Sequence, residues 1–372
     1  MLKVYGVTFD HTTNYGSLFQ AYALKTAIEQ EKGVGGCEYS LIPIRQMPDY
    51  TGKTSAADAA YMAAYRLLHR SRFTRFEKKH LRFADCSSLK ELDALNDSAD
   101  AFVCGSDVIW NPEFNKGCGA YYLDFAKKYK FSYAASFGKA NAEAITPQIG
   151  QWLKQLDAIS CREQRACGIA AKVTGNMPPV VADPIFLLDR SRWEKICAED
   201  KGALPGHYIF AYNTYPDAAY EAVLKQLGSQ TGLPIIRSTW KLKNALSQRM
   251  ITVQPPARWL RLLAGADYVV TNSFHGTGFA VLFHRNFYSI APGTAEQGAN
   301  VRIWDLLTRL GLDQRIVSSA SQTIPAGELD YSEADERLEA FRKESADYLR
   351  QNLEAAMRRK KAGGESPDRQ RS

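Results

Sequence analysis

The stretch DYVVTNSFHGTGFAVLF, Asp267 to Phe283, joins an apolar run, a polar loop and a helical pattern. The apolar run ends at Val270, small and polar residues follow from Thr271 to Thr277, and the helical pattern opens with Gly278. Small residues before a helix let backbone N–H groups approach a ligand, and the positive end of the helix dipole favours an anion there. The stretch therefore predicts a strand–loop–helix unit of an α/β fold with an anion site at its loop.

The same alternation occurs on both sides of this stretch. Apolar runs such as LKVYGVTF (Leu2–Phe9) and KFSYAASFG (Lys130–Gly138) alternate with helical patterns, and the alternation restarts at HYIFAYN (His207–Asn213). Such alternation predicts parallel sheets built from βαβ units, and a length of 372 residues favours two domains. We expect two Rossmann-like α/β domains and a final helix that crosses back to the first. The predicted parts are residues 1–188, residues 189–330, a C-terminal helix at 331–359 and a flexible tail at 360–372.

Composition narrows the class of protein. Hydrophobic residues make up 45% of the chain and charged residues 23%, which is the balance of a soluble globular protein. The seven cysteines form no C-x-x-C pair and no His–Cys cluster with metal spacing, so we expect reduced thiols and no bound metal. The N-terminus shows no secretory signal and no apolar run is long enough to span a bilayer, so we expect a cytoplasmic protein.

The net charge of +7 comes partly from a basic segment at Tyr65–Phe83 and from the C-terminal run. No recognised nucleic-acid module accompanies this charge, so we expect no nucleic-acid partner. The basic segment fits peripheral association with anionic lipid at the inner face of the membrane, or with an acidic glycan carrier. A solvated helix face is the simpler alternative. The sequence leaves the oligomeric state open.

His275 is the candidate catalytic group in the opening stretch. Histidine is the side chain best matched to proton transfer near neutral pH, and a charged imidazole also pairs with phosphate. In the alternative interpretation, Ser273 and Thr277 only cap the helix and His275 makes a structural hydrogen bond. The residues alone leave both interpretations open.

A second polar loop, CGSDVIWNPEF at Cys104–Phe114, ends a strand of the first half. Gly105 to Asp107 predicts a tight turn that ends in a carboxylate. Trp110 beside Asn111 suits a sugar, whose hydroxyls need directed hydrogen bonds and whose C–H face stacks on indole. The alternative is an Asx turn with Trp110 in the core.

Two arginines are candidate anion ligands. Arg162 follows a strand in SCREQ, and its guanidinium could bind carboxylate or phosphate through paired hydrogen bonds. An ordinary surface pair with Glu163 is the alternative. Arg302, just before a helix, offers a second cation for a doubly anionic substrate, or is simply solvated.

Five segments together resemble the polysaccharide pyruvyl transferase family. They are NYGSLFQAYAL (14–24), GSDVIWNP (105–112), SCREQ (160–164), VVADP (180–184) and TNSFHGTGFAVLF (271–283). Each segment alone is a weak signal, whereas their order and the His-centred loop are fairly specific. The resemblance runs from about Lys3 to Leu312 and leaves out the tail after Arg359.

The resemblance implies a GT-B-like architecture and a transferase of polysaccharide biosynthesis. It implies phosphoenolpyruvate as donor and a sugar of a cell-surface polysaccharide, an exopolysaccharide for example, or its lipid-linked precursor as acceptor, with no cofactor. The first domain would take the acceptor and the second the donor, and the region Ala56–Phe83 would set acceptor choice. His275 matches the catalytic histidine, Arg162 takes the place of a donor-binding arginine, and Asn14 to Ser17 would line the inter-domain cleft. The candidate substrate-binding residues are Asn14, Tyr15, Gly16, Ser17, Gly105, Ser106, Asp107, Trp110, Asn111, Asn272, Ser273, Phe274, Gly276, Thr277 and Arg302.

Two other functions remain open at this level. A glycosyltransferase of the same architecture would use His275 and Arg162 to neutralise the leaving diphosphate of a nucleotide-sugar. A non-catalytic glycan or nucleotide sensor would keep the cleft without turnover. The sequence has no G-x-S-x-G elbow, no Walker A loop and no G-x-G-x-x-G fingerprint, which disfavours serine hydrolases, P-loop NTPases and standard dinucleotide enzymes.

Overall fold

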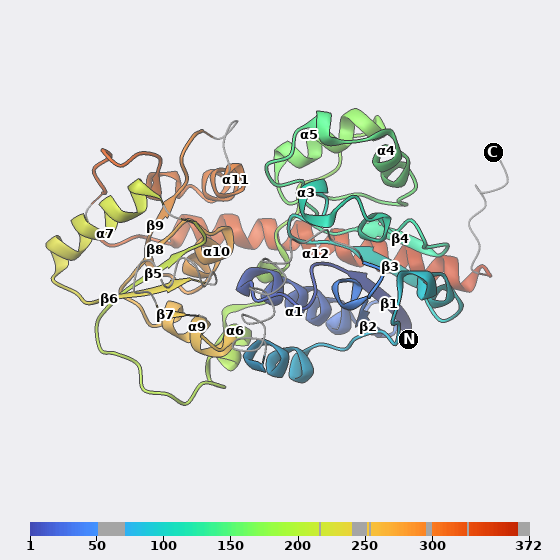
Figure 1. The fold of residues 1–372 in the computed structure, drawn as a ribbon, viewed down its shortest axis with the longest axis horizontal. Helices are drawn as coiled ribbons and strands as arrows, with labels where there is room; N and C mark the ends of the chain where they lie inside the picture. The colour runs from blue at the N-terminus through green and yellow to red at the C-terminus, as the bar shows by residue number, and fades with distance from the viewer. Residues whose placement is uncertain are drawn as a thin grey trace.

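The computed structural model describes residues 1–50, 71–215, 217–239, 251–252, 254–294, 300–325 and 327–363. It contains two parallel sheets with helices packed around them (Figure 1). We call each sheet with its helices a lobe. The first sheet has the order β2-β1-β3-β4, and its strands are buried along nearly their whole length, as parallel strands covered on both faces are. Its strands are β1 (Leu2–Val7), β2 (Cys37–Leu41), β3 (Ala101–Cys104) and β4 (Tyr129–Ser132).

The second sheet has the order β10-β9-β8-β5-β6-β7. Counted from its first strand, this is the 3-2-1-4-5-6 order of a Rossmann fold, with β5 and β8 as the central neighbours. Tyr268 of β8 pairs with Ile209 of β5 on one side and with Asn286 of β9 on the other. The strands are β5 (Ile209–Asn213), β6 (Ile235–Thr239), β7 (Ile251–Thr252), β8 (Tyr268–Thr271), β9 (Asn286–Ile290) and β10 (Ile316–Val317).

Helices connect the strands in both lobes, and several begin at a side chain that caps them. Asn14 caps α1 and Asp217 caps α7, each by accepting hydrogen bonds from backbone N–H groups of the first turn. Residues 71–80 are also helical. The helices are α1 (Tyr15–Gln30), α3 (Pro112–Asn115), α4 (Pro147–Lys154), α5 (Gln164–Thr174), α6 (Arg190–Cys197), α7 (Ala218–Thr231), α9 (Pro256–Ala264), α10 (Phe274–Leu282), α11 (Val301–Arg309) and α12 (Ser332–Lys361).

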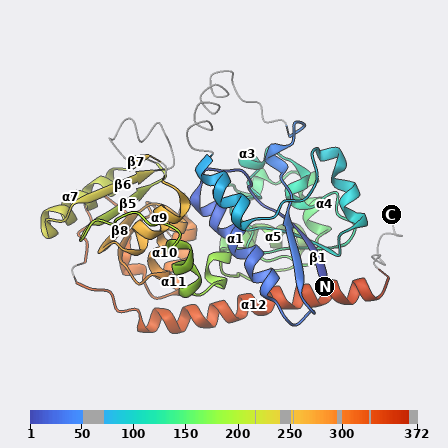
Figure 2. The ribbon, with the colours of Figure 1, turned by 90° about the horizontal axis from the view of Figure 1, so that it is seen from below.

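Helix α1 follows the first strand of the first lobe but packs into the core of the second. Its residues Tyr15 and Phe19 are fully buried in one hydrophobic cluster with Trp193, Trp259 and Phe279. The Tyr15 ring stacks on the Trp259 ring with 4.6 Å between the centroids. The two lobes therefore share apolar core at α1, which lies between them in Figures 1 and 2.

Helix α12 runs along both lobes (Figure 2). At its start, the Tyr331 hydroxyl donates to the carbonyl of Arg285 in the second lobe (2.7 Å). Farther along, the Tyr348 hydroxyl donates to the carbonyl of Ser132 in the first sheet (3.0 Å), and the Tyr129 hydroxyl donates to Asn352 Oδ1 (2.9 Å). The prediction of a GT-B-like α/β architecture, in which the final helix returns to the first domain, is confirmed.

Several boundaries differ from those expected from sequence. Helix α10 begins at Phe274 rather than at Gly278, because Ser273 caps it. The final helix ends at Lys361. Residues 65–70 of the basic segment and residues 364–372 of the tail lie outside the described residues, and the domain boundary after residue 188 stays a prediction. No helix in the described part of the chain is long and apolar enough to cross a membrane.

Candidate functional site

Each sheet has a switch point, where the connections from two neighbouring strands leave in opposite directions. In parallel α/β folds, ligands bind at this point. In the first sheet it lies between β1 and β3, and the turn Gly105 to Asp107 follows β3. In the second sheet it lies between β5 and β8, and Asn272 and Ser273 follow β8. The two polar loops singled out in the sequence therefore follow strands at the switch points of the two sheets.

The turn after β3 brings a buried carboxylate close to α1 and to Arg162. Gly105 has a φ of 137°, and a β-carbon there would lie 1.9 Å from the carbonyl oxygen of Tyr133, so only glycine fits. Asp107 has the left-handed φ of 69° that non-glycine residues rarely adopt. Its Oδ2 accepts a hydrogen bond from the Ser17 hydroxyl (2.5 Å). Burial raises the pKa of Asp107, but Arg162 and His275 outweigh it, so the pKa is lowered and the group stays ionised.

The loop after β8 is held by its own polar side chains. Asn272 Oδ1 accepts from the backbone N–H of Thr214 (2.7 Å), and its Nδ2 donates to the carbonyl of Tyr215 (2.9 Å), which ties β8 to β5. Ser273 caps α10 by accepting from the N–H of Gly276, as the capping interpretation expected. Thr277 does not cap this helix, because its hydroxyl is fully buried against Ser289 (2.7 Å). The predicted anion-binding role of Thr277 is thus not supported by its side chain.

Arg162 lies in the interior, which corrects the alternative of a surface pair. It is 5% exposed, and its Nη1 donates to Asp183 Oδ2 (2.8 Å). Its guanidinium carbon lies 4.5 Å from the ring centroid of Phe274, the first residue of α10. Within the described residues, Nε and Nη2 have no hydrogen-bond partner. Buried N–H groups of this kind favour an anionic ligand.

His275 reaches the same carboxylate from the second lobe. Its Nε2 lies 3.4 Å from Asp183 Oδ2, and the residue is 6% exposed. Its other nitrogen, Nδ1, faces Gly16 of α1, where a β-carbon would lie only 2.0 Å away. The structure therefore brings His275, Arg162 and Gly16 together at the boundary between the lobes.

Asp183, which binds both groups, was not among the predicted site residues. Its Oδ2 also accepts from the Ser106 hydroxyl (3.0 Å), and its Oδ1 accepts from the N–H of Ile185 (3.1 Å). Burial raises its pKa, yet His275 and Arg162 together hold the pKa far below its usual range. The signal in the sequence was VVADP, in which a carboxylate directly follows an apolar run.

Glu163 and Arg302 complete the charged surroundings. Glu163 Oε1 accepts from the Ser136 hydroxyl (2.6 Å), whereas its Oε2 lies 3.9 Å from Arg162 Nε. Burial raises the pKa of Glu163 above its ordinary value, despite the nearby arginines. Arg302 is half-buried in the first turn of α11, and burial and the positive Arg162 lower its pKa. Two arginines thus lie within electrostatic reach of each other and of three carboxyl groups, those of Asp107, Glu163 and Asp183.

Other predicted site residues serve the fold. Trp110 is fully buried, its indole N–H donates to the carbonyl of Tyr121 (3.3 Å), and its ring packs on Tyr122 and Phe137. It offers no face to a sugar, so the stacking prediction is corrected in favour of the core alternative. Asn111 caps α3 by accepting from the N–H of Glu113.

The four residues predicted to form a turn are the N-cap and first turn of α1, and two of them touch the charged cluster. Gly16 lies against His275, and Ser17 donates to Asp107. Asn14 caps α1 by accepting from the N–H of Gly16 (2.9 Å), and Tyr15 packs in the core shared by the lobes. The turn therefore lies at the boundary between the lobes.

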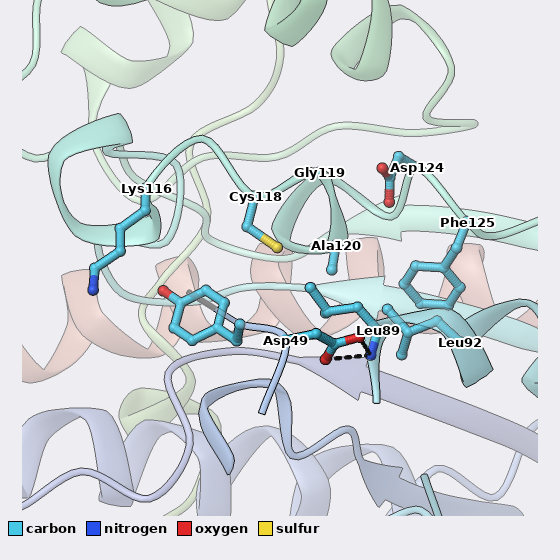
Figure 3. Close-up of a pocket in the computed structure, with 10 residues that line it drawn as sticks. Asp49, Leu89, Leu92, Lys116, Cys118, Gly119, Ala120, Asp124 and Phe125 are labelled. Atoms are coloured by element: carbon cyan, nitrogen blue, oxygen red, sulfur yellow. Dashed lines mark hydrogen bonds between the residues drawn. The ribbon is translucent and has the colours of Figure 1, made fainter. Parts of the chain in front are cut away.

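A separate cavity of about 390 Å³ lies in the first lobe (Figure 3). Its lining mixes carboxylates, a lysine and aromatic rings, among them Asp49, Lys116 and Phe125, and shares no residue with the charged cluster. The Asp49 carboxylate accepts hydrogen bonds from the N–H of Leu89 (2.9 and 3.0 Å) and so supports the local chain. In the described ranges, no three His, Cys, Asp or Glu side chains gather as metal ligands do. The expectation that no cofactor is needed stays a prediction.

Similar folds occur among solved structures of low sequence identity. The S. aureus MnaA–UDP co-structure is 11% identical, with 97% of this chain and 96% of that chain covered and a TM-score of 0.49. UDP-GlcNAc 2-epimerase from Methanocaldococcus jannaschii, in complex with UDP-GlcNAc and UDP, is 12% identical (91% and 98% covered, TM-score 0.47). E. coli heptosyltransferase WaaC with ADP-2-deoxy-2-fluoro heptose is 13% identical (92% and 99% covered, TM-score 0.41).

A comparison with curated proteins gives no match. The family model described as polysaccharide pyruvyl transferase matches residues 14–294. This range begins at the N-cap of α1, contains Asp107, Arg162, Asp183 and His275, and covers most of the chain. The chain therefore belongs to the polysaccharide pyruvyl transferase family and is a transferase.

Proposed function

We propose that the protein transfers the enolpyruvyl group of phosphoenolpyruvate to two hydroxyls of a sugar and forms a pyruvate ketal. The observation that carries the proposal is the convergence of Arg162 and His275 on one buried carboxylate between the lobes, with two guanidinium nitrogens that have no hydrogen-bond partner in the described part of the chain. A small dianion suits such a site, because buried guanidinium N–H groups that have no hydrogen-bond partner gain from an anionic acceptor. Membership of the family supports the same reaction class.

The reaction requires a proton carrier and cationic groups. Protonation of the methylene carbon of phosphoenolpyruvate turns it into a methyl group and leaves a cationic centre at the adjacent carbon. One sugar hydroxyl adds to that carbon and gives up its proton; the second hydroxyl then displaces phosphate, which takes the second proton. In this proposal His275 carries the first proton, and Arg162 with Arg302 holds the carboxylate and phosphate.

The acceptor is a sugar of a cell-surface polysaccharide or its lipid-linked precursor in this proposal. The family supports a glycan acceptor. The first lobe would hold it, since Asp107 and Ser106 at the end of β3 face the cluster from that side. A cytoplasmic location, at the inner face of the membrane for a lipid-linked acceptor, follows from this choice.

The test is incubation of the protein with phosphoenolpyruvate and candidate glycans. We expect release of inorganic phosphate together with a glycan mass gain equal to pyruvate less water, and loss of both in His275→Ala while the variant stays folded. Thermal shift adds a direct comparison of donors, because a ligand that binds only the folded state raises its stability. Stabilisation by a nucleotide-sugar, with no response to phosphoenolpyruvate, would instead favour a glycosyltransferase. A biological effect that survives in His275→Ala would favour a sensor.

A further inference from the structure

The two nitrogens of His275 have different surroundings. Nε2 lies 3.4 Å from Asp183 Oδ2 and is buried without another partner in the described chain. Nδ1 lies over the backbone of Gly16, the one residue type that leaves room for it there. A neutral imidazole carries its proton on one nitrogen and accepts on the other, and the group it faces decides which. An ionised carboxylate only accepts, so it selects the form with the proton on Nε2.

Asp183 is itself held in place from several sides. Its two oxygens accept from the Ser106 hydroxyl, the Ile185 N–H and Arg162 Nη1 (3.0, 3.1 and 2.8 Å). The backbone N–H of the preceding residue, Ala182, donates to Ser345 Oγ of α12 (2.8 Å). The carboxylate therefore has little freedom to turn away from the imidazole.

We propose that Asp183 is the positioning residue of the site: it fixes His275 in the Nε2–H form, so that Nδ1, on the Gly16 side, exchanges the proton with the substrate. This inference rests on the proposed function for its chemistry. The imidazolium gives its Nδ1 proton to the methylene carbon of the donor, and Nδ1 then takes the proton of the attacking hydroxyl. The histidine ends the reaction as it began.

The same carboxylate orients Arg162. With Nη1 occupied by Asp183, the edge formed by Nε and Nη2 remains for a ligand among the described groups. One buried carboxylate would thus orient the proton carrier from the second lobe and an anion-binding guanidinium from the first. Three other charged groups act on this region. Asp107 Oδ1 lies 3.7 Å from Arg162 Nη2, and Glu163 Oε2 lies 3.9 Å from Arg162 Nε, both beyond hydrogen-bond distance. Arg302 in α11 lies within electrostatic reach of Arg162.

The first test measures the wild-type protein and uses a variant only to assign the signal. In protein labelled with ¹⁵N at histidine, the signal of His275 is assigned by its loss in His275→Gln. We expect the neutral imidazole of the wild-type protein to carry its proton on Nε2. A neutral imidazole with its proton on Nδ1 would overturn the inference. Because this measurement uses no phosphoenolpyruvate, it is independent of the proposed reaction.

The second test is Asp183→Asn, whose amide can donate as well as accept. We expect the Nε2–H preference to weaken and kcat to fall on the order of 10⁴-fold, as in other enzymes where an aspartate orients a histidine. The pH dependence of kcat should also change, since the carboxylate no longer faces the imidazole. A folded variant with unchanged histidine signal and unchanged kcat would overturn the inference.

A matched control is Asp200→Asn in the second lobe. Asp200 Oδ2 accepts from Arg258 and Arg261 (both 2.9 Å), so it too is a carboxylate between guanidinium groups. We expect this change to leave the His275 signal and kcat as in the wild type. If wild-type protein shows the Nε2–H form but transfers no pyruvyl group to any glycan, the proposed function fails while the role of Asp183 in holding the imidazole stands.

Discussion

Glu163 is a carboxyl group that folding buries beside Arg162 at the long distance of 3.9 Å. Burial raises the pKa of Glu163 more than the attraction of the nearby arginines lowers it, so the pKa lies above its ordinary value. A carboxyl with a raised folded-state pKa stabilises the fold below its unfolded-state pKa, and this contribution is lost as the pH rises through the raised value. Glu163→Gln does not titrate. We therefore expect the stability of wild type minus that of the variant to fall as the pH rises from about 4 to about 8, measured by urea unfolding.

Glu91 provides the opposite case. It is exposed, and hydrogen bonds from the backbone and side chain of Ser87 lower its pKa. The ionised Glu91 stabilises the fold above its unfolded-state pKa, and this contribution is lost on acidification. The stability of wild type minus that of Glu91→Gln should therefore rise with pH. A Glu163→Gln difference that rose with pH would contradict the assignment of a raised pKa.

At the residue scale, the sequence predicted those site residues that can be recognised from their position after an apolar run. His275 lies shortly after β8 of the second sheet, whereas Arg162 follows Cys161, which pairs through isolated bridges and not within a strand. Because ligands of parallel α/β folds bind beyond the carboxyl ends of the strands, a site shared by the two groups could still be expected. Asp183 also follows an apolar run, but its importance depends on contacts with both lobes that no local pattern reveals. The prediction for Trp110 was wrong because the sequence pattern of a tryptophan in a polar loop is the same whether the indole faces solvent or packs in the core.

At the element scale, the two lobes pack against each other at α1. The Tyr15 ring is fully buried against Trp259, and its hydroxyl donates to the carbonyl of Gln254 (2.9 Å). Removing a buried aromatic ring costs about 3–5 kcal/mol, so we expect Tyr15→Ala to lower the free energy of unfolding by about that amount. Phe114→Ala, at a side chain that is 46% exposed, should change it by less than about 0.5 kcal/mol. Urea unfolding measures both, and equal effects would contradict a core shared by the lobes.

The sequence predicted the order of strands and helices, but it did not predict where each helix begins or which lobe it packs against. Alternating apolar runs and helical patterns gave the parallel α/β class. The start of α10 was placed too late because Phe274 and His275 were taken for loop residues, although Ser273 is a typical N-cap. That α1 would pack on the second lobe could not be foreseen, since its residues are apolar on most sides and show no single buried face.

At the scale of the whole molecule, α12 is a second connection between the lobes. Leu338 and Phe341 pack in the core of the second lobe, while Leu349 and Leu353 pack against the first sheet. Between these two contacts, Ser345 binds the segment that carries Asp183. The helix therefore both joins the lobes and supports the carboxylate that lies between them.

Ser345→Ala tests this support. Ser345 is fully buried, and its Oγ accepts from the Ala182 N–H (2.8 Å) while donating to the carbonyl of Phe341 (2.6 Å). Without the hydroxyl the buried Ala182 N–H loses its acceptor, which costs about 1–3 kcal/mol, and we expect that loss in urea unfolding together with faster hydrogen exchange at Ala182. Ser332→Ala, the same change at an exposed position of the helix, should leave both as in the wild type. Unchanged exchange at Ala182 in Ser345→Ala would show that α12 does not hold the segment before Asp183. The carboxylate would then be held by its own hydrogen bonds from Ser106, Arg162 and the Ile185 N–H.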